Sequence, residues 1–373
     1  AARRMPGMSN RDTRSRIAIV GANFAGLAAA GQLGREHAVT VIDPSPWFEW
    51  LPNIHELVSG EKRPADLRLP RARLVQRAGH RFVRAQVTSI DAPAGKLTTS
   101  SGRRILFDLC IVAVGGVNET FGVRGVDRNG WPFKSVDECA RIGRNLAALA
   151  RRRGRKSVVI VGGGLEGIEA LGEILRRYRD VEDFEISLVE AGPRLLPEAP
   201  RKLDAAVRSH CDGRSVRLLT GIPVTAVTPK RVRLASGELL RSDLTIWTGG
   251  VTAPSLLHVS GLTDRPGQWA PVTNALCSRR LDNVLVIGDA AALPRPLAKQ
   301  AYYALQMGAC AAENATRALK GRKLRDFRPS PKPMLIAFGD LDTFLVSGRT
   351  VIASPKLAAL KEAVFQLTMA ELD

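Results

Sequence analysis

The chain has 373 residues, of which 45% are hydrophobic and 5% are aromatic. That length accommodates two or three domains with cores of their own, and the composition fits an α/β protein. No apolar run approaches the length of a membrane span, which argues against an integral membrane protein.

Arginine greatly outnumbers lysine, and the formal net charge is +19. Codon usage in a G+C-rich genome would explain this excess by itself. The alternative is a surface that contacts anionic lipid, nucleic acid or an acidic protein. The basic runs at 151–156 and 322–325 are where we expect such a surface.

The five cysteines are odd in number, widely spaced and without a C-x-x-C pair. This usage favours a reducing cytoplasm and argues against a dithiol that reduces disulfides. A relay between two cysteines distant in sequence is the alternative. The cysteines are Cys110, Cys139, Cys211, Cys277 and Cys310.

Residues 1–14 are basic and precede an apolar stretch that begins at Ile17, an order similar to that of a signal peptide. Cleavage there would destroy the strand and turn described next. We therefore expect a disordered basic tail.

The first informative pattern is a strand, a glycine turn and a helix start. Apolar residues 17–20 predict a buried strand, a helix is expected at 26–34, and a second apolar strand ends on Asp43. The turn residues that we expect at a ligand are Gly21, Asn23, Phe24, Ala25 and Gly26.

Such a turn binds a pyrophosphate, because glycine lets the backbone approach closely and the helix N-terminus offers unpaired N–H groups. The acid that ends the next strand accepts hydrogen bonds from a ribose. The half closes with an apolar strand that begins at Ile105 and stops on Gly115 and Gly116.

After a helical pattern at 135–153, the same device recurs about 140 residues later. A strand at 157–161 leads to a second glycine turn, and the following strand ends on Glu190. A strand at 244–247 closes this half on Gly249 and Gly250, as the first half closed. The turn residues expected at a ligand are Gly162, Gly164, Leu165 and Gly167.

Two complete devices predict two bound dinucleotides, and a flavin with a nicotinamide nucleotide makes a hydride relay. The strand at 283–289 and the helix at 297–319 lack a third fingerprint, so we expect them to complete the first domain. The fold class is therefore α/β, with two Rossmann-like domains, the second inserted in the first. We expect the first dinucleotide-binding domain, for which the resemblance described below implies FAD, at 15–119 and 247–328. The second, for which it implies NAD(P)H, is expected at 120–246, with a small α+β segment at 329–373.

The C-terminal segment ends in an amphipathic helical pattern at 355–370. Leu357, Leu360, Val364 and Leu367 recur at helical spacing. Such a stripe packs on the parent domain or a twin subunit, or it contacts a membrane surface.

These residues, in this order, resemble the two-dinucleotide flavoprotein superfamily, and in detail its type II NADH dehydrogenase and apoptosis-inducing-factor-like quinone reductase branch. The segments at 21–26, 162–173, 247–254 and 284–291 carry the resemblance. It implies that the first fingerprint binds FAD and the second NADH. It also places Gly288 and Asp289 at the flavin's ribityl and phosphate groups, and the loop around Pro52 beside FAD.

The resemblance implies that Glu169 lies near the nicotinamide and flavin rings; helix-start electrostatics is the plainer explanation of this acid. The sequence departs from the family at Asn23, where a glycine is usual, and at Tyr302, where type II dehydrogenases carry the first of two glutamines. The second, Gln306, remains. Lys299 and Tyr302 instead resemble the quinone reductases, and a lysine would stabilise a reduced, anionic flavin.

We therefore expect an FAD-dependent NAD(P)H dehydrogenase that passes two electrons to a quinone or similar small acceptor, with Glu169, Lys299, Tyr302 and Gln306 around the rings and no metal. Glu190 favours NADH over NADPH, while Arg194 keeps NADPH as an alternative. Other acceptors are oxygen, a ferredoxin-like protein or a biosynthetic intermediate.

An alternative of another class is a nucleic-acid-binding or redox-signalling flavoprotein with little turnover, although two complete sites argue against nucleic acid as the main partner. We expect a cytoplasmic protein, with peripheral contact at the inner face of the membrane and a homodimer as further alternatives.

Overall fold

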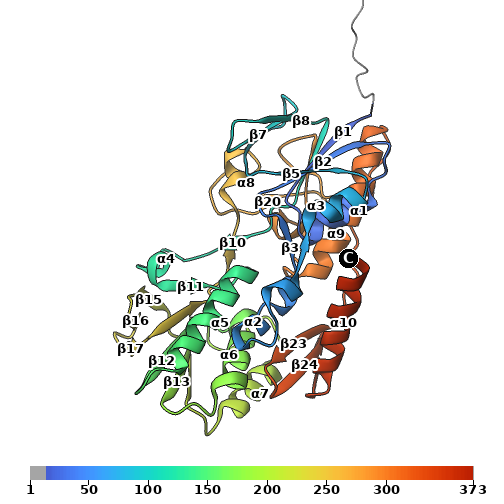
Figure 1. The fold of residues 1–373 in the computed structure, drawn as a ribbon. Helices are drawn as coiled ribbons and strands as arrows, with labels where there is room; N and C mark the ends of the chain where they lie inside the picture. The colour runs from blue at the N-terminus through green and yellow to red at the C-terminus, as the bar shows by residue number, and fades with distance from the viewer. Residues whose placement is uncertain (1–13, 373) are drawn as a thin grey trace, which may run out of the picture. The chain divides into compact units, whose positions relative to one another are not determined.

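The computed structural model describes residues 14–372, so nearly all of the expected basic tail lies outside the described residues. The chain forms two compact units (Figure 1). Unit 1 contains the described part of Ala1–Phe48, with Pro70–Gly116 and Ala253–Ser330. Unit 2 contains Glu49–Leu69, Val117–Thr252 and the described part of Pro331–Asp373.

Unit 1 is built on a five-stranded parallel sheet in the order β21-β9-β1-β2-β5. Its central strand is apolar and buried along Ile17 to Val20, as expected for a strand covered on both faces. The late strand β21 pairs with β9, so the chain returns to complete the first domain as predicted. The strands are β1 (Arg16–Val20), β2 (Ala38–Asp43), β5 (Arg81–Arg84), β9 (Leu109–Val112) and β21 (Val284–Val286).

Helices and smaller sheets surround this sheet. Helix α9 packs along α1, and an antiparallel sheet of three strands lies beyond β5 in sequence. These elements are α1 (Phe24–Gln32), α3 (Arg71–Arg77), β6 (Val87–Asp91), β7 (Lys96–Thr99), β8 (Arg104–Leu106), α8 (Ser255–Val259), β20 (Ala270–Pro271), η3 (Gly288–Ala290), β22 (Ala291–Ala292) and α9 (Ala301–Leu319).

Unit 2 repeats the arrangement with a parallel sheet in the order β11-β18-β12-β13-β14. Strand β12 again stands in the middle and leads into the helix that follows the glycine turn. The strands are β11 (Gly130–Pro132), β12 (Lys156–Val161), β13 (Phe184–Glu190), β14 (Val216–Thr220) and β18 (Leu244–Trp247).

The other elements of unit 2 include two three-stranded antiparallel sheets. The helices are η1 (Leu51–Asn53), α2 (Glu56–Ser59), η2 (Pro64–Leu67), α4 (Val126–Asn129), α5 (Val136–Ala150), α6 (Leu165–Tyr178), α7 (Arg201–Cys211) and α10 (Leu357–Leu372). The strands are β10 (Val117–Asn118), β15 (Val224–Val227), β16 (Arg231–Leu234), β17 (Leu239–Arg241), β19 (Val251–Thr252), β23 (Met334–Phe338), β24 (Asp342–Ser347) and β25 (Thr350–Ala353). The chain passes between the units within β3 (Trp47–Glu49) and β4 (Arg68–Pro70).

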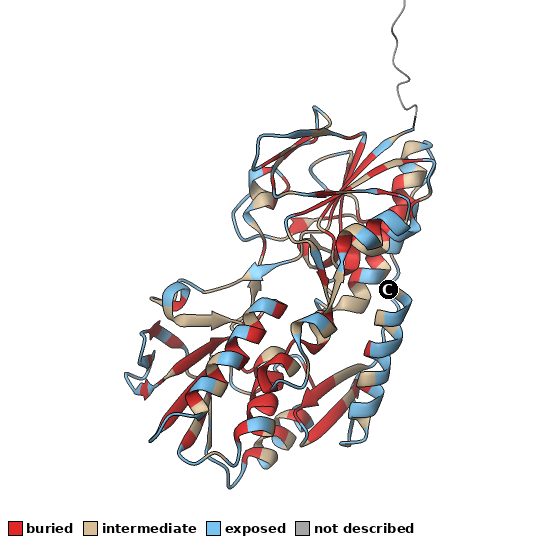
Figure 2. Cartoon of the chain, viewed as in Figure 1, coloured by how far each residue is buried: buried red, intermediate tan, exposed pale blue. Residues whose placement is uncertain are grey.

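Each unit has its own hydrophobic core on its parallel sheet, and both sheets are coloured as buried along most of their strands in Figure 2. Aliphatic side chains dominate both cores, because strands that are covered on two faces favour Val, Ile and Leu.

The units differ most from the expected domain boundaries in two places, and the shorter stretches 117–119 and 247–252, expected in the FAD domain, also belong to unit 2. Residues 49–69, expected in the FAD domain, belong to unit 2, where Arg68 bridges Glu49 at 2.6 Å and Asp137 at 2.8 Å. Residues 331–373, expected as a separate segment, also belong to unit 2. Their strand β23 packs on α6 so closely that a Cβ on Gly172 would lie 2.5 Å from the amide nitrogen of Gly339.

The predicted C-terminal helix is α10, and it presents its apolar stripe outward. Leu360, Val364 and Leu367 are 46%, 47% and 67% exposed, whereas Lys361 and Phe365 are buried. Among residues 14–372, no helix is both long and apolar enough to span a membrane.

Candidate functional site

The first glycine turn follows the end of β1 and is closely packed. Gly21 has φ +98°, and a Cβ there would collide with the backbone oxygen of Ala113. Gly26 passes directly over Gly21, which also leaves no space for a side chain. Phe24 is buried edge-to-face against Phe48, with centroids 5.3 Å apart, so it packs in the core behind the turn.

Asp43 at the end of β2 is tied to the turn. Its carboxylate accepts from the backbone N–H of Ala22 at 2.8 Å and of Ser45 at 2.9 Å. It also pairs with the buried guanidinium of Arg71, whose Nε donates to the carbonyl of Ala22 at 2.7 Å. The acid predicted at a ribose therefore stands beside the turn, held by an arginine that the sequence did not single out.

The second predicted FAD segment lies against the same helix. A Cβ on Gly288, which has φ +65°, would lie 3.2 Å from the Cβ of Ala25. The Gly288 N–H contacts the sulfur of Met307 at 3.2 Å. Gly115, also predicted at FAD, has φ +63° and open space around its Cα. Segments distant in sequence therefore meet at the N-terminus of α1.

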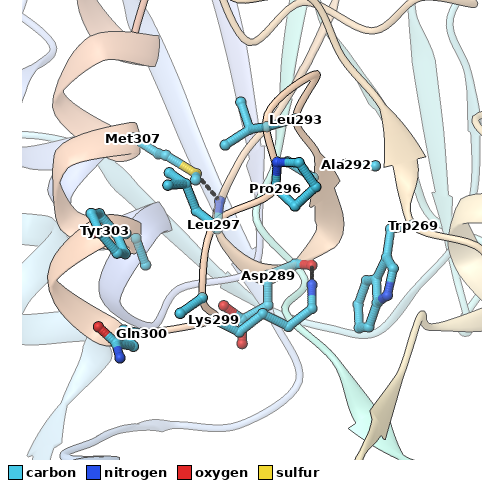
Figure 3. A pocket seen from close by; sticks show the side chains of 14 residues that line it. Trp269, Asp289, Ala292, Leu293, Pro296, Leu297, Lys299, Gln300, Tyr303 and Met307 are labelled. Carbon is cyan, nitrogen blue, oxygen red and sulfur yellow. Dashed lines mark hydrogen bonds between the residues drawn. The ribbon is translucent and has the colours of Figure 1, made fainter. Parts of the chain in front are cut away.

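A cavity of about 220 Å³ opens beside Gly288 and Asp289 (Figure 3). Leu293, Pro296 and Leu297 give it an apolar wall. Lys299 extends across it, with Nζ 3.3 Å from the centroid of the Trp269 indole, and it donates to the carbonyl of Asp289. Burial lowers the pKa of Lys299. Lys299, the lysine predicted near the flavin, thus lines this cavity and makes a cation–π contact with Trp269.

Two other residues predicted near the rings lie on α9. The rings of Tyr302 and Tyr303 are 4.2 Å apart, and Tyr303 lines the cavity. The Gln306 amide makes two bonds with the backbone of Ser330, at 2.8 and 3.0 Å. Gln306 therefore fixes the end of unit 1.

The second glycine turn, in unit 2, repeats the geometry of the first. Gly162 has φ +112°, and a Cβ there would lie 2.5 Å from the carbonyl oxygen of Thr248. Gly167 sits directly over Gly162. Gly164 caps α6 with open space around it, and Leu165 is exposed beside it. Gly249 follows β18, where a Cβ would meet the Trp247 ring at 2.8 Å.

Glu190 has the same relation to this turn that Asp43 has to the first. Its carboxylate accepts from the N–H of Gly163 at 2.6 Å and of Gly192 at 2.6 Å. The guanidinium of Arg194 donates instead to backbone carbonyls at Leu196, 2.8 Å away, and at Pro197. Arg194 therefore binds its own loop.

Glu169, predicted near the reacting rings, is buried on α6 in a cluster of charged groups. Lys361 Nζ of α10 lies 2.6 Å from one carboxylate oxygen, which also accepts from the Ala337 N–H at 3.3 Å. His55 Nδ1 lies 3.5 Å from the other oxygen, and its Nε2 is 3.4 Å from Lys361. Burial raises the pKa of Glu169, and burial together with Lys361 lowers that of His55 well below its ordinary value.

A second buried acid follows one turn later on the same face of α6. Glu173 accepts from Ser59 Oγ and lies 3.5 Å from Arg176. Burial raises its pKa to about 7. Glu166, at the start of the helix, pairs with Lys134. Charge therefore lines one side of α6 from its N-terminus inward.

The predicted aromatic loop is shared between the units. Phe48 belongs to unit 1, whereas Pro52 lies in η1 of unit 2. Trp50 of that loop is buried, donates from its indole to Asn53 at 2.8 Å and packs on Phe365 of α10 at 6.1 Å.

None of the five cysteines, all within the described residues, forms a disulfide. Burial raises the pKa of Cys110 to about 12 and those of Cys211 and Cys310 to about 11. High pKa values keep the thiols protonated, which argues against a reactive cysteine relay.

Sequence reasoning missed Arg71, His55, Trp269 and Lys361. Arg71 is a single arginine after a proline, and Trp269 is a single tryptophan in a loop. Neither local sequence indicates which residue its side chain contacts in the fold. Lys361 was visible as a polar residue of the amphipathic helix, but only the fold brings it to Glu169.

Comparison with known proteins agrees with this geometry. The family model for pyridine nucleotide-disulphide oxidoreductases matches residues 15–308. A type II NADH:quinone oxidoreductase of Staphylococcus aureus (strain NCTC 8325 / PS 47) is 28% identical over 381 residues, which cover 94% of this chain and 94% of that protein.

Two solved structures share the fold. NDH2 from Plasmodium falciparum in complex with NADH superposes with a TM-score of 0.84 at 15% identity, covering 95% of this chain and 94% of that one. The sulfide:quinone oxidoreductase from Aquifex aeolicus gives 0.82 at 17% identity, with 96% and 91% covered. Since the family model spans well over half of the sequence, this chain belongs to the pyridine nucleotide-disulphide oxidoreductase family.

Proposed function

We propose that this protein is an FAD-dependent NADH dehydrogenase that passes two electrons to a quinone. The observation that carries the proposal is the pair of glycine cradles, one in each unit, each with an acid bonded to a backbone amide of its own turn. Both turns require glycine, because a Cβ on Gly21 or Gly162 would collide with the carbonyl oxygen of Ala113 or of Thr248. Each turn leads into a helix N-terminus, which favours a pyrophosphate.

When bound, FAD and NADH supply the hydride chemistry, and the chain has to bind, orient and shield them. In unit 1, Asp43 would accept hydrogen bonds from a ribose, and Lys299 would bring a positive charge to the cavity beside Gly288. In unit 2, Glu190 would bind the ribose of NADH. The type II NADH:quinone oxidoreductase name of the Staphylococcus aureus relative supports NADH as donor and a quinone as acceptor.

The buried cluster of Glu169, Lys361 and His55 is suited to hold a proton, which quinone reduction consumes along with electrons. Burial raises the pKa of Glu169, and the 2.6 Å contact with Lys361 opposes that shift by favouring the charged carboxylate. Glu169→Gln would then slow reoxidation of the flavin by quinone more than its reduction by NADH. Equal effects on both half-reactions would rule out this role.

The outward stripe of α10 is the part of the chain suited to contact an anionic membrane surface. Leu360, Val364 and Leu367 share one exposed face, and the net charge of +19 favours anionic lipid. Co-sedimentation with anionic vesicles should weaken for Leu367→Glu but not for Gln366→Glu, which adds the same charge off the stripe. Equal binding by both variants would refute the idea, and a dimer lost only in Leu367→Glu would assign the stripe to self-association.

The decisive experiment is an anaerobic titration of the purified protein with NADH and then a short-chain quinone. The flavin absorption band should bleach with NADH and return with quinone. Bleaching without recovery would support the NADH dehydrogenase activity but not the quinone as acceptor. The acceptor would then be oxygen, a ferredoxin-like protein or a metabolite. A protein without flavin, or a band that does not bleach, would overturn the proposal.

A further inference from the structure

The segment that follows β10 contains an aromatic residue in a backbone conformation that aromatics avoid. The N–H of Val123 donates to the carbonyl of Thr120 at 2.9 Å, which closes a tight turn. Both central residues are left-handed, Phe121 at φ +51° and Gly122 at φ +66°. Turns of this kind favour Asn, Asp or Gly at the first central position, and a bulky residue there is strained.

The Phe121 side chain is also exposed to solvent. It is 68% exposed, the highest value among the exposed large hydrophobic side chains of the described residues. Neither the conformation nor the burial of its ring explains a phenylalanine here. Backbone strain and exposed apolar area together indicate a residue kept for a contact that the folded chain does not itself provide.

The position of Phe121 is fixed by the loop after β18. Its N–H donates to Glu119 Oε1 at 2.7 Å, the Glu119 N–H donates to the Gly250 carbonyl at 3.1 Å, and the Trp247 indole donates to the Glu119 carbonyl at 2.7 Å. A Cβ on Gly250 would lie 3.6 Å from the Phe121 ring. The ring therefore stands at the carboxyl end of β18, within unit 2.

The order of the strands says which part of a dinucleotide passes there. Strands β18 and β13 flank β12 on opposite sides, and the glycine turn follows β12. Glu190, at the end of β13, is placed for the adenosine ribose. A dinucleotide whose pyrophosphate lies on the turn extends its other half toward β18. The Phe121 ring stands on that side.

We infer that Phe121 packs against the nicotinamide ring of NADH and helps to hold that ring at the end of β18. The inference rests on the proposed NADH site and adds a residue to it. An exposed ring beside a glycine offers an apolar face to a flat heterocycle, while Gly250 keeps the approach open. The left-handed turn directs the ring there at a cost in stability.

Anaerobic calorimetric titration of the FAD-bound protein with two ligands tests the inference, with the flavin reduced beforehand so that NADH binds without being oxidised. ADP-ribose shares the adenosine, pyrophosphate and distal ribose of NADH but lacks the nicotinamide ring. Phe121→Ala should raise the Kd for NADH by about tenfold and leave that for ADP-ribose within about twofold. Equal losses for both ligands, or an unchanged Kd for NADH, would overturn it.

A second variant, Phe121→Gly, tests the backbone strain and shows whether weaker NADH binding comes from a less stable fold. Phe121→Gly removes the ring and relieves the left-handed backbone, so it should raise the Tm while it weakens NADH binding as Phe121→Ala does. A lower Tm would contradict the strain argument. The wild-type protein separates the proposed function from the role of Phe121. If it does not bind NADH at all, the proposed function is wrong. If both variants bind NADH as the wild type does, only the role of Phe121 is wrong.

Discussion

At the scale of single residues, the two nucleotide turns use the same device with different support. Asp43 and Glu190 each accept a hydrogen bond from an amide of their own glycine turn. Asp43 is additionally buried against Arg71, whereas Glu190 relies on the amides of Gly163 and Gly192. Loss of one cation, Arg71, should therefore disturb the first site, whereas no single cation of the described residues supports Glu190 in the same way.

Arg71→Ala should lower both stability and FAD content. Removing one partner of a buried ion pair leaves the Asp43 carboxylate without its cation, which costs about 3–5 kcal/mol. Thermal unfolding and the ratio of flavin to protein absorbance measure the two effects. Arg81→Ala, an exposed arginine on β5, is the control, and the double variant Arg71→Met with Asp43→Asn should recover part of the lost stability.

Arg194→Ala should leave the preference for NADH over NADPH unchanged, because its guanidinium already binds carbonyls of its own loop. Glu190→Ala should raise the KM for NADH about tenfold or more, since it loses charge-assisted bonds to ribose. Steady-state kinetics with both nucleotides make the comparison. A KM for NADPH that rises selectively in Arg194→Ala would mean that the guanidinium turns toward a 2′-phosphate.

Glu173 should make stability depend on pH near neutrality. Its pKa is about 7 in the folded protein against an ordinary value of 4.5, so the folded state binds this proton more tightly. The stabilising contribution is complete below about pH 4.5 and is lost as pH rises through about 7. Thermal scans from about pH 5 to about pH 8 measure this. The Tm of Glu173→Gln minus the Tm of the wild type should increase as the pH rises. Curves that stay parallel would contradict this, and Glu182→Gln, at an exposed glutamate, is the control for the substitution itself.

At the scale of elements, the close packing of α1 on α9 positions the first glycine turn. A Cβ on Gly308 of α9 would collide with the Ala25 carbonyl and lie 2.7 Å from the Ala28 side chain. Gly31, on α1, is exposed, and a Cβ there would have nothing within 4 Å. The two glycines therefore have opposite tolerance for a methyl group.

Gly308→Ala should cost about 1–3 kcal/mol by overpacking and should loosen FAD, since the displaced helix carries the turn. Gly31→Ala should instead stabilise by about 0.5–1 kcal/mol, as alanine does in an exposed helix interior. Denaturant unfolding and flavin retention after gel filtration test the pair. Equal behaviour of the two variants would show that α1 and α9 are not in tight contact.

The helices and parallel strands could be predicted from the sequence because apolar periodicity and glycine turns are local signals. The helix predicted at 297–319 begins at Ala301, and the one at 355–370 is α10. The environment of α10 could not be predicted: Lys361 is buried and the leucine stripe is exposed, because Glu169, distant in sequence, supplies the partner charge. Ion pairs between distant segments leave no local pattern.

At the scale of the whole molecule, two cradles in separate units predict separable losses. Gly162→Val should abolish reduction by NADH while flavin stays bound, since its side chain would collide with the Thr248 carbonyl in unit 2. Gly21→Val should instead yield a protein without flavin. Absorption spectra of the two purified variants decide this. Flavin loss in Gly162→Val would reverse the assignment of the sites.

The insertion of one domain into the other could be predicted, because the second fingerprint interrupts a pattern that resumes near residue 283. The exact boundaries between the two domains could not be predicted. Residues 49–69 read as a continuation of the first domain, yet Arg68 anchors them to Glu49 and Asp137. Such anchoring depends on which surface a loop meets after folding.

The way in which the chain divides also bears on how the protein is synthesised. Strand β21 and helix α9 of unit 1 are translated after most of unit 2, and β23 to α10 of unit 2 follow them. During translation the first glycine turn therefore waits through most of unit 2 before the segment carrying Gly288 emerges. Flavin capture is expected only after that segment has been made, and a shortage of flavin would leave unit 1 incomplete and exposed to proteases and chaperones.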